Sequence, residues 1–155
     1  MYQDLIVNLY LDHLNKEIHV KNNDIKIKRV LSPHSDKVVS FIESTFTKGW
    51  ASEAKAALYH NNPTCFIAVK DNNIIGFACY DATAKGYFGP IGVESGYNGF
   101  NIGQALLFSA LKAMKNDGYG YAIIGSVSDK VLPFYQKNLE LIINKRIQSV
   151  YDRMY

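Results

Sequence analysis

Features of membrane, secreted and metal-binding proteins are scarce in this sequence of 155 residues. Its two cysteines are too few for the disulfide framework of a small secreted protein. Its apolar runs are far shorter than the ~18 residues that a membrane-spanning helix needs, and residues 1–13 lack the basic start of a signal peptide. No group of His, Cys, Asp and Glu has metal-ligand spacing. We therefore expect a cytoplasmic protein with no metal and no membrane partner.

Charge is also modest, with a formal net charge of +3. The densest basic cluster is Lys26, Lys28 and Arg29, which indicates the solvated side of a strand more than a phosphate-binding patch. A mild positive charge is compatible with an anionic cofactor and does not indicate a nucleic-acid partner. Because 48% of the residues are hydrophobic, the chain can form a sizeable core, and we predict a single domain over residues 1–155.

Hydrophobic periodicity predicts alternating helices and strands, with no repeat and no linker. Residues 24–31 alternate like a half-buried strand, and Ser32 and Pro33 then resemble the cap and first residue of a helix. The elements predicted next are a helix over 50–60 with Trp50, Ala54, Ala57 and Leu58 on one face, strands at 64–70, 73–81 and 86–94, a helix over 101–116, a strand at 121–127 and a short helix at 131–138. Residues 139–147 and 149–155 are expected to complete the sheet edge, whereas the first 20 residues suit a strand or a helix equally.

Cys65 and Cys79 flank a turn signal, KDNN, between two apolar runs. A hairpin folded about Asn72 would place them opposite each other on neighbouring strands. A disulfide is conceivable in that geometry, but cytosolic redox conditions disfavour it, and neither thiol lies next to a base in the sequence. We therefore expect two buried free thiols without a nucleophilic role.

The stretch over 89–107, GPIGVESGYNGFNIGQALL, is the most informative part of the chain. An apolar strand runs into a loop of small residues, and that loop opens an amphipathic helix. The first N–H groups of a helix have no partner within it, and the helix dipole favours an anion there. Residues that permit a close approach or a left-handed backbone recur in the loop: Gly96, Asn98, Gly99, Asn101 and Gly103. The pattern predicts a phosphate or pyrophosphate site that is neither a Walker A nor a Rossmann loop, because it has no Gly-Lys-Ser/Thr and no GxGxxG.

This segment resembles the coenzyme A loop of the GNAT acetyltransferase superfamily, in which Arg/Gln-x-x-Gly-x-Gly/Ala follows a strand that ends in valine. Val93 matches that valine, Gly103 matches the second glycine, and Ile102 takes the apolar position between the glycines. Asn98 stands where the family has Arg or Gln, and Asn101 replaces the first glycine. Asn101 can supply the same backbone shape, whereas Asn98 lacks the long side chain, so a weaker hold on coenzyme A is expected.

The order of the predicted elements over residues 24–145 is also the GNAT order. The resemblance implies an α/β (α+β) fold with a mixed central β-sheet and helices on both faces. It also implies an N-acetyltransferase that uses acetyl-coenzyme A as co-substrate. The implied acetyl-coenzyme A contacts are Ile91, Gly92, Val93, Asn98, Gly99, Phe100, Asn101, Ile102, Gly103 and Gln104.

In GNAT enzymes the strand before the loop diverges from the next strand, and the pantetheine arm pairs with its open edge. The resemblance assigns this edge to residues 91–93, with a main-chain N–H near Ile91 as the donor to the developing oxyanion. Gly89 and Pro90, just before that edge, suit a β-bulge, since proline cannot donate to a ladder. The alternative is that these residues merely kink a buried strand.

Tyr135 lies in PFYQKN, which resembles the family's FYEK element, where a tyrosine near the sulfur serves as general acid. Phenol and thiol pKa values are close enough for proton transfer, although a tyrosine on a short amphipathic helix is often only part of the core. As general base we favour Glu94, which ends the key strand. Asp81, Glu53 and a water relay are the alternatives.

The acceptor groove of this architecture is lined by the first two helices and the hairpin loops. The resemblance therefore implies acceptor contacts from Trp50, Glu53, Tyr80 and Asp81. Aromatic rings beside carboxylates suit a primary amine with an apolar body, on a small molecule or a peptide. Trp50 could equally serve only to join the two helices.

Three hypotheses about function follow. The leading one is an acetyl-coenzyme A-dependent N-acetyltransferase acting on a small-molecule or peptide amine. The second is a module that binds coenzyme A or an acyl form without turnover, which the departures at Asn98 and Asn101 keep open. The third is a scaffold or dimerisation domain in which the loop is only a helix N-terminus. A homodimer is compatible with each.

Overall fold

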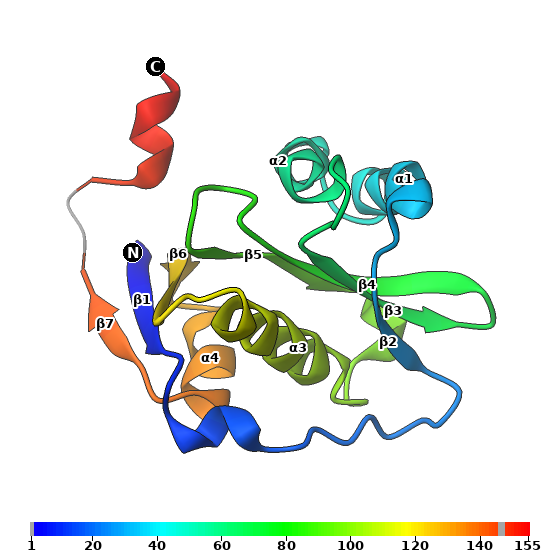
Figure 1. Ribbon diagram of the computed structural model, residues 1–155, viewed down its shortest axis with the longest axis horizontal. Helices are drawn as coiled ribbons and strands as arrows, with labels where there is room; N and C mark the ends of the chain where they lie inside the picture. Colours follow the sequence, from blue (N-terminus) through cyan, green and yellow to red (C-terminus); the bar gives the residue numbers. More distant parts are fainter. Residues whose placement is uncertain (1, 146–147) are drawn as a thin grey trace.

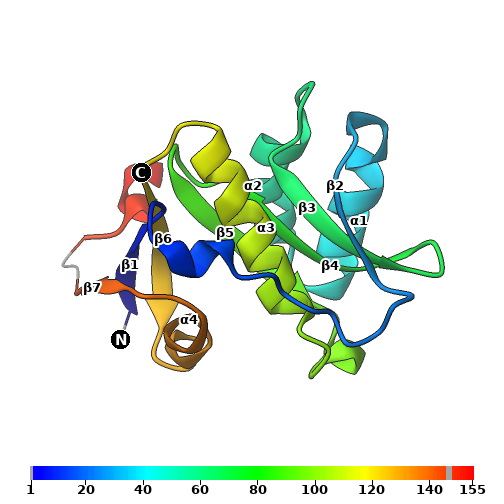
Figure 2. The ribbon, with the colours of Figure 1, turned by 60° about the horizontal axis from the view of Figure 1, so that its bottom comes forward.

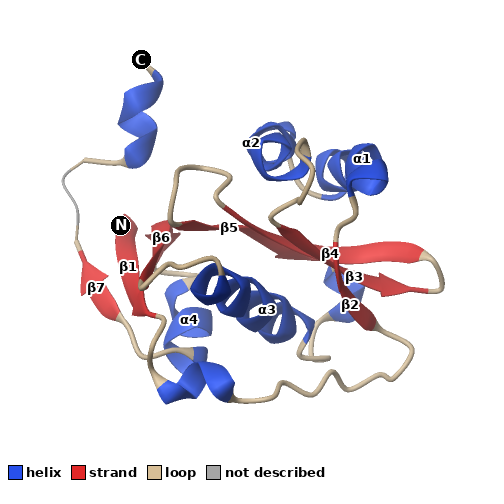
Figure 3. Ribbon diagram, viewed as in Figure 1, coloured by secondary structure: helices blue, strands red, loops and turns tan. Residues whose placement is uncertain are grey.

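The computed structural model describes residues 2–145 and 148–155, and within these ranges seven strands form one mixed sheet (Figures 1 and 3). In their order across the sheet they are β2 (Lys26–Arg29), β3 (Cys65–Lys70), β4 (Asn73–Tyr80), β5 (Tyr87–Val93), β6 (Tyr121–Ser128), β1 (Tyr2–Asn8) and β7 (Ile142–Asn144). β5 and β6 run parallel, and the other neighbours run antiparallel. The predicted mixed sheet is confirmed.

Helices cover both faces of the sheet (Figures 1 and 2). α1 (Ser35–Thr45) and α2 (Lys48–Leu58) lie on one face, and α3 (Ile102–Asn116) and α4 (Leu132–Asn138) lie on the other. Strand β4 contributes to both cores, because successive side chains of a strand point to opposite faces. Phe77 and Cys79 are buried in the core beneath α1 and α2, whereas Ala78 and Tyr80 are buried in the core shared with α3.

α1 and α2 begin differently from the prediction. A short 3-10 turn precedes α1 over Ser32–His34, with Pro33 in its first turn and no side-chain cap from Ser32. α2 begins earlier than expected, because the Thr47 hydroxyl accepts a hydrogen bond from the Trp50 N–H at 3.0 Å. The buried face of α2 therefore starts at Ala51, and Trp50, predicted on that face, is 38% exposed.

The β3–β4 hairpin forms as predicted. Asp71 and Asn72 adopt positive φ angles of 51° and 63°, as both central residues of a type I′ turn do. This turn sets the register that places Cys65 directly opposite Cys79. Both cysteines are free thiols with 0% exposure.

The start of the chain, which suited a strand or a helix equally, forms β1. β1 pairs with β6 on one side and with β7 on the other, so β7 completes the sheet edge as expected for part of 139–147. Residues 146 and 147, which that prediction included, lie outside the described residues.

The expectation that residues 149–155 add to the sheet is wrong, because Val150–Met154 forms a 3-10 helix. A capping box explains it: the Ser149 hydroxyl accepts from the Tyr151 N–H at 3.1 Å, and the Asp152 carboxylate accepts from the Ser149 N–H at 2.9 Å. In the described part of the chain, no helix has both the length and the apolar character that crossing a membrane requires.

Candidate active site

The strand β5 diverges from β6 after a single short stretch of pairing. Only Tyr87 and Phe88 pair with β6, opposite Ile123 and Ile124. Along β4, by contrast, the pairing of β5 continues to Val93. The divergence opens a gap between two parallel strands in the middle of the sheet, as the resemblance implied.

A β-bulge lies where β5 turns away. Tyr80 pairs with Phe88 and Ala78 pairs with Ile91, so β5 has one more residue than β4 between these pairs. The extra residue falls at Gly89 and Pro90, where Gly89 has a φ of +117° that favours glycine. The predicted bulge is present.

Beyond the bulge, one edge of β5 faces the gap. The Glu94 N–H donates to the Ile75 carbonyl on β4 at 2.8 Å. Since N–H groups alternate between the two edges of a strand, those of Val93 and Ile91 point away from β4, toward the gap. This edge can pair with an extended amide-containing ligand.

The loop between β5 and α3 has the backbone shape expected of a coenzyme A loop. Gly99 has a φ of +88° and Asn101 a φ of +65°, so Asn101 takes the left-handed conformation that a glycine would otherwise supply. Asn101 is the N-cap of α3, and its carbonyl accepts the first helical bond, from the Ala105 N–H at 3.0 Å. The N–H groups of residues 102–104 therefore have no partner within the helix.

The connection between β1 and β2 supports this loop, although no sequence pattern indicates it. The Lys21 N–H donates to the Phe100 carbonyl at 3.1 Å, and the Asn101 side-chain amide donates to the His19 carbonyl at 3.1 Å. The positions of Asn101 and of the α3 N-terminus thus depend on the long connection between β1 and β2. No local pattern in residues 16–23 signals such a contact.

A cavity of about 310 Å³ lies over the α3 N-terminus. Its lining contains most of the residues predicted to bind the cofactor: Val93, Asn98, Gly99, Asn101, Ile102, Gly103 and Gln104. Ile91, Gly92 and Phe100 are not in this lining. α4 adds Phe134, Lys137 and Asn138 to the cavity wall, and Lys137 supplies a cation that the sequence analysis missed. The cavity offers backbone N–H groups, a helix dipole and a positive side chain to an anion.

Tyr135 lies on α4 beside the gap and is 4% exposed. Its ring stacks parallel on Phe134 with the centroids 5.1 Å apart and meets Phe88 edge-on at 6.5 Å. It lines an inner hollow of about 420 Å³ that also borders the bulge at Gly89 and Pro90. Burial raises the pKa of the Tyr135 phenol well above its usual range, so the group is protonated at neutral pH and can donate a hydrogen bond.

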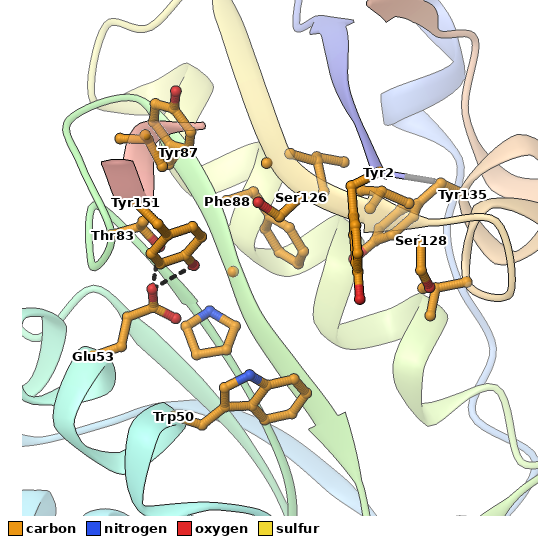
Figure 4. A pocket seen from close by; sticks show the side chains of 17 residues that line it. Tyr2, Trp50, Glu53, Thr83, Tyr87, Phe88, Ser126, Ser128, Tyr135 and Tyr151 are labelled. Atoms are coloured by element: carbon orange, nitrogen blue, oxygen red, sulfur yellow. Dashed lines mark hydrogen bonds between the residues drawn. The ribbon is translucent and has the colours of Figure 1, made fainter. Parts of the chain in front are cut away.

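Two of the predicted acceptor contacts, Trp50 and Glu53, line the same inner hollow as Tyr135 (Figure 4). The Glu53 carboxylate accepts from the Thr83 hydroxyl at 3.0 Å and from the Tyr151 hydroxyl at 2.6 Å. An outer hollow of about 1050 Å³ adjoins this point, and Lys85 and Arg153 are among its lining residues. The structure thus brings a carboxylate, an indole ring and a phenol proton donor to one hollow.

Tyr80 and Asp81 are not brought to these hollows. The Tyr80 side chain is buried on the α3 side of the sheet, where its hydroxyl accepts from Arg29 at 2.9 Å and donates to Asp117. The Asp81 carboxylate accepts from the Tyr119 hydroxyl at 2.8 Å and from the Gly86 N–H at 2.8 Å. Both side chains connect structural elements, and neither lines the inner or the outer hollow.

Glu94 does not line the inner hollow that Tyr135 lines. It is half-buried and follows the last residue of β5, where its backbone pairs with Ile75. Within residues 2–145 and 148–155, no group of three His, Cys, Asp or Glu side chains is placed to hold a metal ion.

Comparisons with known proteins agree with this fold. The chain superposes on part of a fungal multi-domain GH3 beta-N-acetylglucosaminidase that has a GCN5-related glucosamine N-acetyltransferase region, with a TM-score of 0.69 and 15% identity over 92% of this chain and 20% of that one. For a GCN5-related N-acetyltransferase from Sphaerobacter thermophilus the TM-score is 0.58, at 15% identity over 98% of this chain and 46% of that one. This chain thus spans less than half of either protein.

A third structure is similar over nearly its whole length. It is an aminoglycoside acetyltransferase from an uncultured soil metagenomic sample, in complex with sisomicin, with a TM-score of 0.57 and 17% identity over 81% of this chain and 97% of that one. No curated protein sequence matches the chain. The sequence profile of the acetyltransferase (GNAT) family matches residues 35–140. The chain therefore belongs to the GNAT family of acetyltransferases, which are acyltransferases.

Proposed function

We propose that this protein transfers an acetyl group from acetyl-coenzyme A to a primary amine of a small molecule or peptide. The single observation that carries the proposal is the gap between β5 and β6, which has an open backbone edge on one side and Tyr135 beside it. We also propose that residues 1–155 act as one domain. The two free thiols of the protein are typical of the cytoplasm, and we propose that the protein works there.

The residues around the gap fit coenzyme A. The edge with the Ile91 and Val93 N–H groups suits the amides of a pantetheine arm, as an added strand would. The cavity at the start of α3 suits the pyrophosphate, and Lys137 in its wall would add a charge contact. This cation on α4 offsets the loss of a long side chain at Asn98.

Acetyl-coenzyme A supplies an activated thioester, and the residues of this chain position it and stabilise charge. A backbone N–H of β5 near Ile91 is suited to donate to the oxyanion that develops on the carbonyl. Tyr135 is suited to donate its phenol proton toward the departing sulfur. The pKa of a phenol is above that of a thiol and burial raises it further, so Tyr135 stabilises the thiolate mainly as a hydrogen-bond donor.

Glu53 is better placed than Glu94 to act on the amine. It lines the hollow that Tyr135 lines, beside Trp50, so a carboxylate and an aromatic ring can both contact an ammonium group. We propose that Glu53 binds the acceptor amine. The amine then loses its proton to Glu53 or to water.

The test is release of free thiol from acetyl-coenzyme A with a panel of primary amines, followed by mass spectrometry of the product. The proposal predicts amine-dependent thiol release and a mass gain of one acetyl group on the amine. The competing hypothesis, a binding module without turnover, predicts a calorimetric signal for acetyl-coenzyme A with no amine-dependent release. Absence of binding as well would exclude both.

A further inference from the structure

We infer that Tyr151 determines acceptor specificity. Its phenol donates a hydrogen bond to the Glu53 carboxylate until the ammonium group of an acceptor takes the place of the phenol. This inference rests on the proposed function, because it concerns the same acceptor site. It assigns the C-terminal 3-10 helix, which the sequence analysis placed in the sheet, to the wall of that site.

Two hollows meet at Tyr151. The inner hollow, of about 420 Å³, reaches Tyr135 and the β5 bulge, and the outer hollow, of about 1050 Å³, opens beside Lys85. Residues that line both hollows form the wall between them: Trp50, Glu53, Thr83, Tyr87, Val150 and Tyr151. Figure 4 shows Tyr151 and Glu53 at one end of the inner hollow and Tyr135 at the other. An amine arriving through the outer hollow therefore meets this wall before it reaches the reaction centre.

The contact that closes the wall is one that an ammonium group can replace. Glu53 Oε2 accepts from the Tyr151 hydroxyl at 2.6 Å and from the Thr83 hydroxyl at 3.0 Å. Both donors are neutral, and in the part of the chain that the structure describes no cation forms an ion pair with Glu53. An ammonium donor would add charge attraction to the hydrogen bond that the phenol makes, and this attraction favours the exchange.

The segment that carries Tyr151 buries little surface. Ser149 and Val150 are half-buried, and the residues from Tyr151 to the C-terminus are exposed, with Tyr151 itself at 40%. The 3-10 helix holds its own shape through the Ser149 capping box. A segment with so little buried surface can leave the wall without disturbing the core.

The chain offers two informative variants and a matched control. Tyr151→Phe removes the competing hydroxyl and keeps the ring, so acceptor KM should fall three- to tenfold with kcat within twofold. Tyr151→Ala also removes the ring and should let bulky amines react that the parent excludes. The control is Tyr155→Phe or Tyr155→Ala, because Tyr155 lies in the same segment and is fully exposed.

A second measurement does not depend on turnover. Trp50 is the one tryptophan of the sequence and lines the wall, so its fluorescence reports on this site alone. We expect acrylamide to quench Trp50 at least twice as efficiently in Tyr151→Ala as in the parent or in Tyr155→Ala. Titration with n-butylammonium chloride should give a fluorescence change at lower concentration in Tyr151→Phe than in the parent, and n-butanol should give none.

Unchanged quenching in Tyr151→Ala, or equal n-butylammonium affinity in Tyr151→Phe and the parent, would overturn the inference. These readouts separate it from the proposed function. If no amine is acetylated while the quenching and titration differences appear, the acetyltransferase proposal fails and the role of Tyr151 in closing the site stands. If amines are acetylated and Tyr151→Phe has the parent's KM, the role of Tyr151 fails alone.

Discussion

The ring of Phe46 lies so close to Gly92 that a β-carbon on Gly92 would be 2.6 Å from Cζ of that ring. Phe46 directly follows α1, and its ring packs against Trp50 and Phe77 with centroid distances of 5.5 and 5.6 Å. The aromatic cluster therefore fixes β5 at the point where its open edge begins. The position must be glycine because any β-carbon there would overlap the Phe46 ring.

Replacing Gly92 with Ala should destabilise the protein by about 1–3 kcal/mol, because Phe46 cannot withdraw without disturbing the rings around it. Urea unfolding measures this change. Gly96→Ala is the control, since in the described part of the chain nothing lies within 4 Å of the added carbon. Phe46→Leu combined with Gly92→Ala should recover part of the loss. A parent-like midpoint for Gly92→Ala alone would show that the contact is not tight in solution.

Gly103→Val should weaken binding of acetyl-coenzyme A at least tenfold. A β-carbon at this position would sit 3.5 Å from the Phe134 ring and 3.8 Å from the Val93 side chain, so the two extra methyl groups fill the cavity over the α3 N-terminus. Gly103→Ala makes only ordinary contacts and should lose little stability. Calorimetry measures the affinity of both variants for acetyl-coenzyme A. The control is Gly96→Val in the same loop. Equal affinity for parent and Gly103→Val would remove this cavity from the cofactor site.

Tyr135→Phe removes one oxygen and preserves the stacking on Phe134, so the unfolding midpoint should barely change. Turnover should fall, at most about 10²-fold, within the range for a general acid. The raised pKa of the phenol favours a smaller effect than full proton transfer would give. The dissociation constant for acetyl-coenzyme A should stay within a few fold. The control is Tyr121→Phe, because Tyr121 is 56% exposed. Unchanged turnover in Tyr135→Phe would exclude Tyr135 from the mechanism.

Tyr80→Phe tests whether Tyr80 connects structural elements or contacts the acceptor amine. The variant loses the hydrogen bonds with Arg29 and Asp117 that join β2, β4 and the end of α3, and we expect a loss of about 1–3 kcal/mol. Acceptor KM should remain within twofold, because Tyr80 lies away from the hollows. A large rise in acceptor KM without a loss of stability would restore Tyr80 to the acceptor site.

Stability should decline above about pH 8.5, where thiols of an unfolded chain ionise. The hydrogen bond with Cys65 and then burial raise the pKa of the Cys79 thiol in the folded protein. A group whose pKa is raised by folding stabilises the folded protein fully at any pH below its pKa in the unfolded chain. This stability is lost as the pH rises through the pKa of the folded protein. Cys79→Ala should therefore flatten the slope between pH 8.5 and 10, because the raised pKa of Tyr119, about 12, lowers stability only from about pH 10 upward, where tyrosines of the unfolded chain ionise.

The same cysteines give a direct chemical test. Both are fully buried and reduced, so a thiol reagent should label them only after unfolding. Exposed thiols would be labelled within minutes in the native protein. Mass spectrometry of a 65–79 crosslink in freshly prepared protein would contradict the expected redox state.

Local patterns predicted most of the fold because they are short-range. The β3–β4 hairpin followed from KDNN between apolar runs, and the start of α3 followed from the glycine-rich loop. Trp50 was misplaced because the true start of α2 depends on one hydroxyl, that of Thr47, which shifts the buried face to Ala51. A pattern of apolar residues alone cannot show that shift.

The acceptor site was harder to predict for a different reason. β4 is buried on both faces, so its apolar run does not reveal that Tyr80 points toward α3 while Cys79 points toward α2. Tyr151 reaches Glu53 across 98 positions of sequence, a contact that no periodicity encodes. The available signal was the Ser-x-x-Asp capping box at Ser149, which indicates a helix start in place of a strand.

The short pairing of β5 with β6 has a mechanical consequence. Strand pairing between the four strands on one side and the three on the other is confined to Tyr87 and Phe88, with a further backbone hydrogen bond from the Ile123 N–H to the Gly86 carbonyl beside them, so the sheet has a seam at its centre. Helix α3 contacts strands on both sides of that seam, but no further strand pairing crosses it within residues 2–145 and 148–155. A ligand held along β5 would continue the hydrogen bonding where the protein's own strands stop. Binding of such a ligand along β5 should therefore make the two halves of the sheet move less relative to each other.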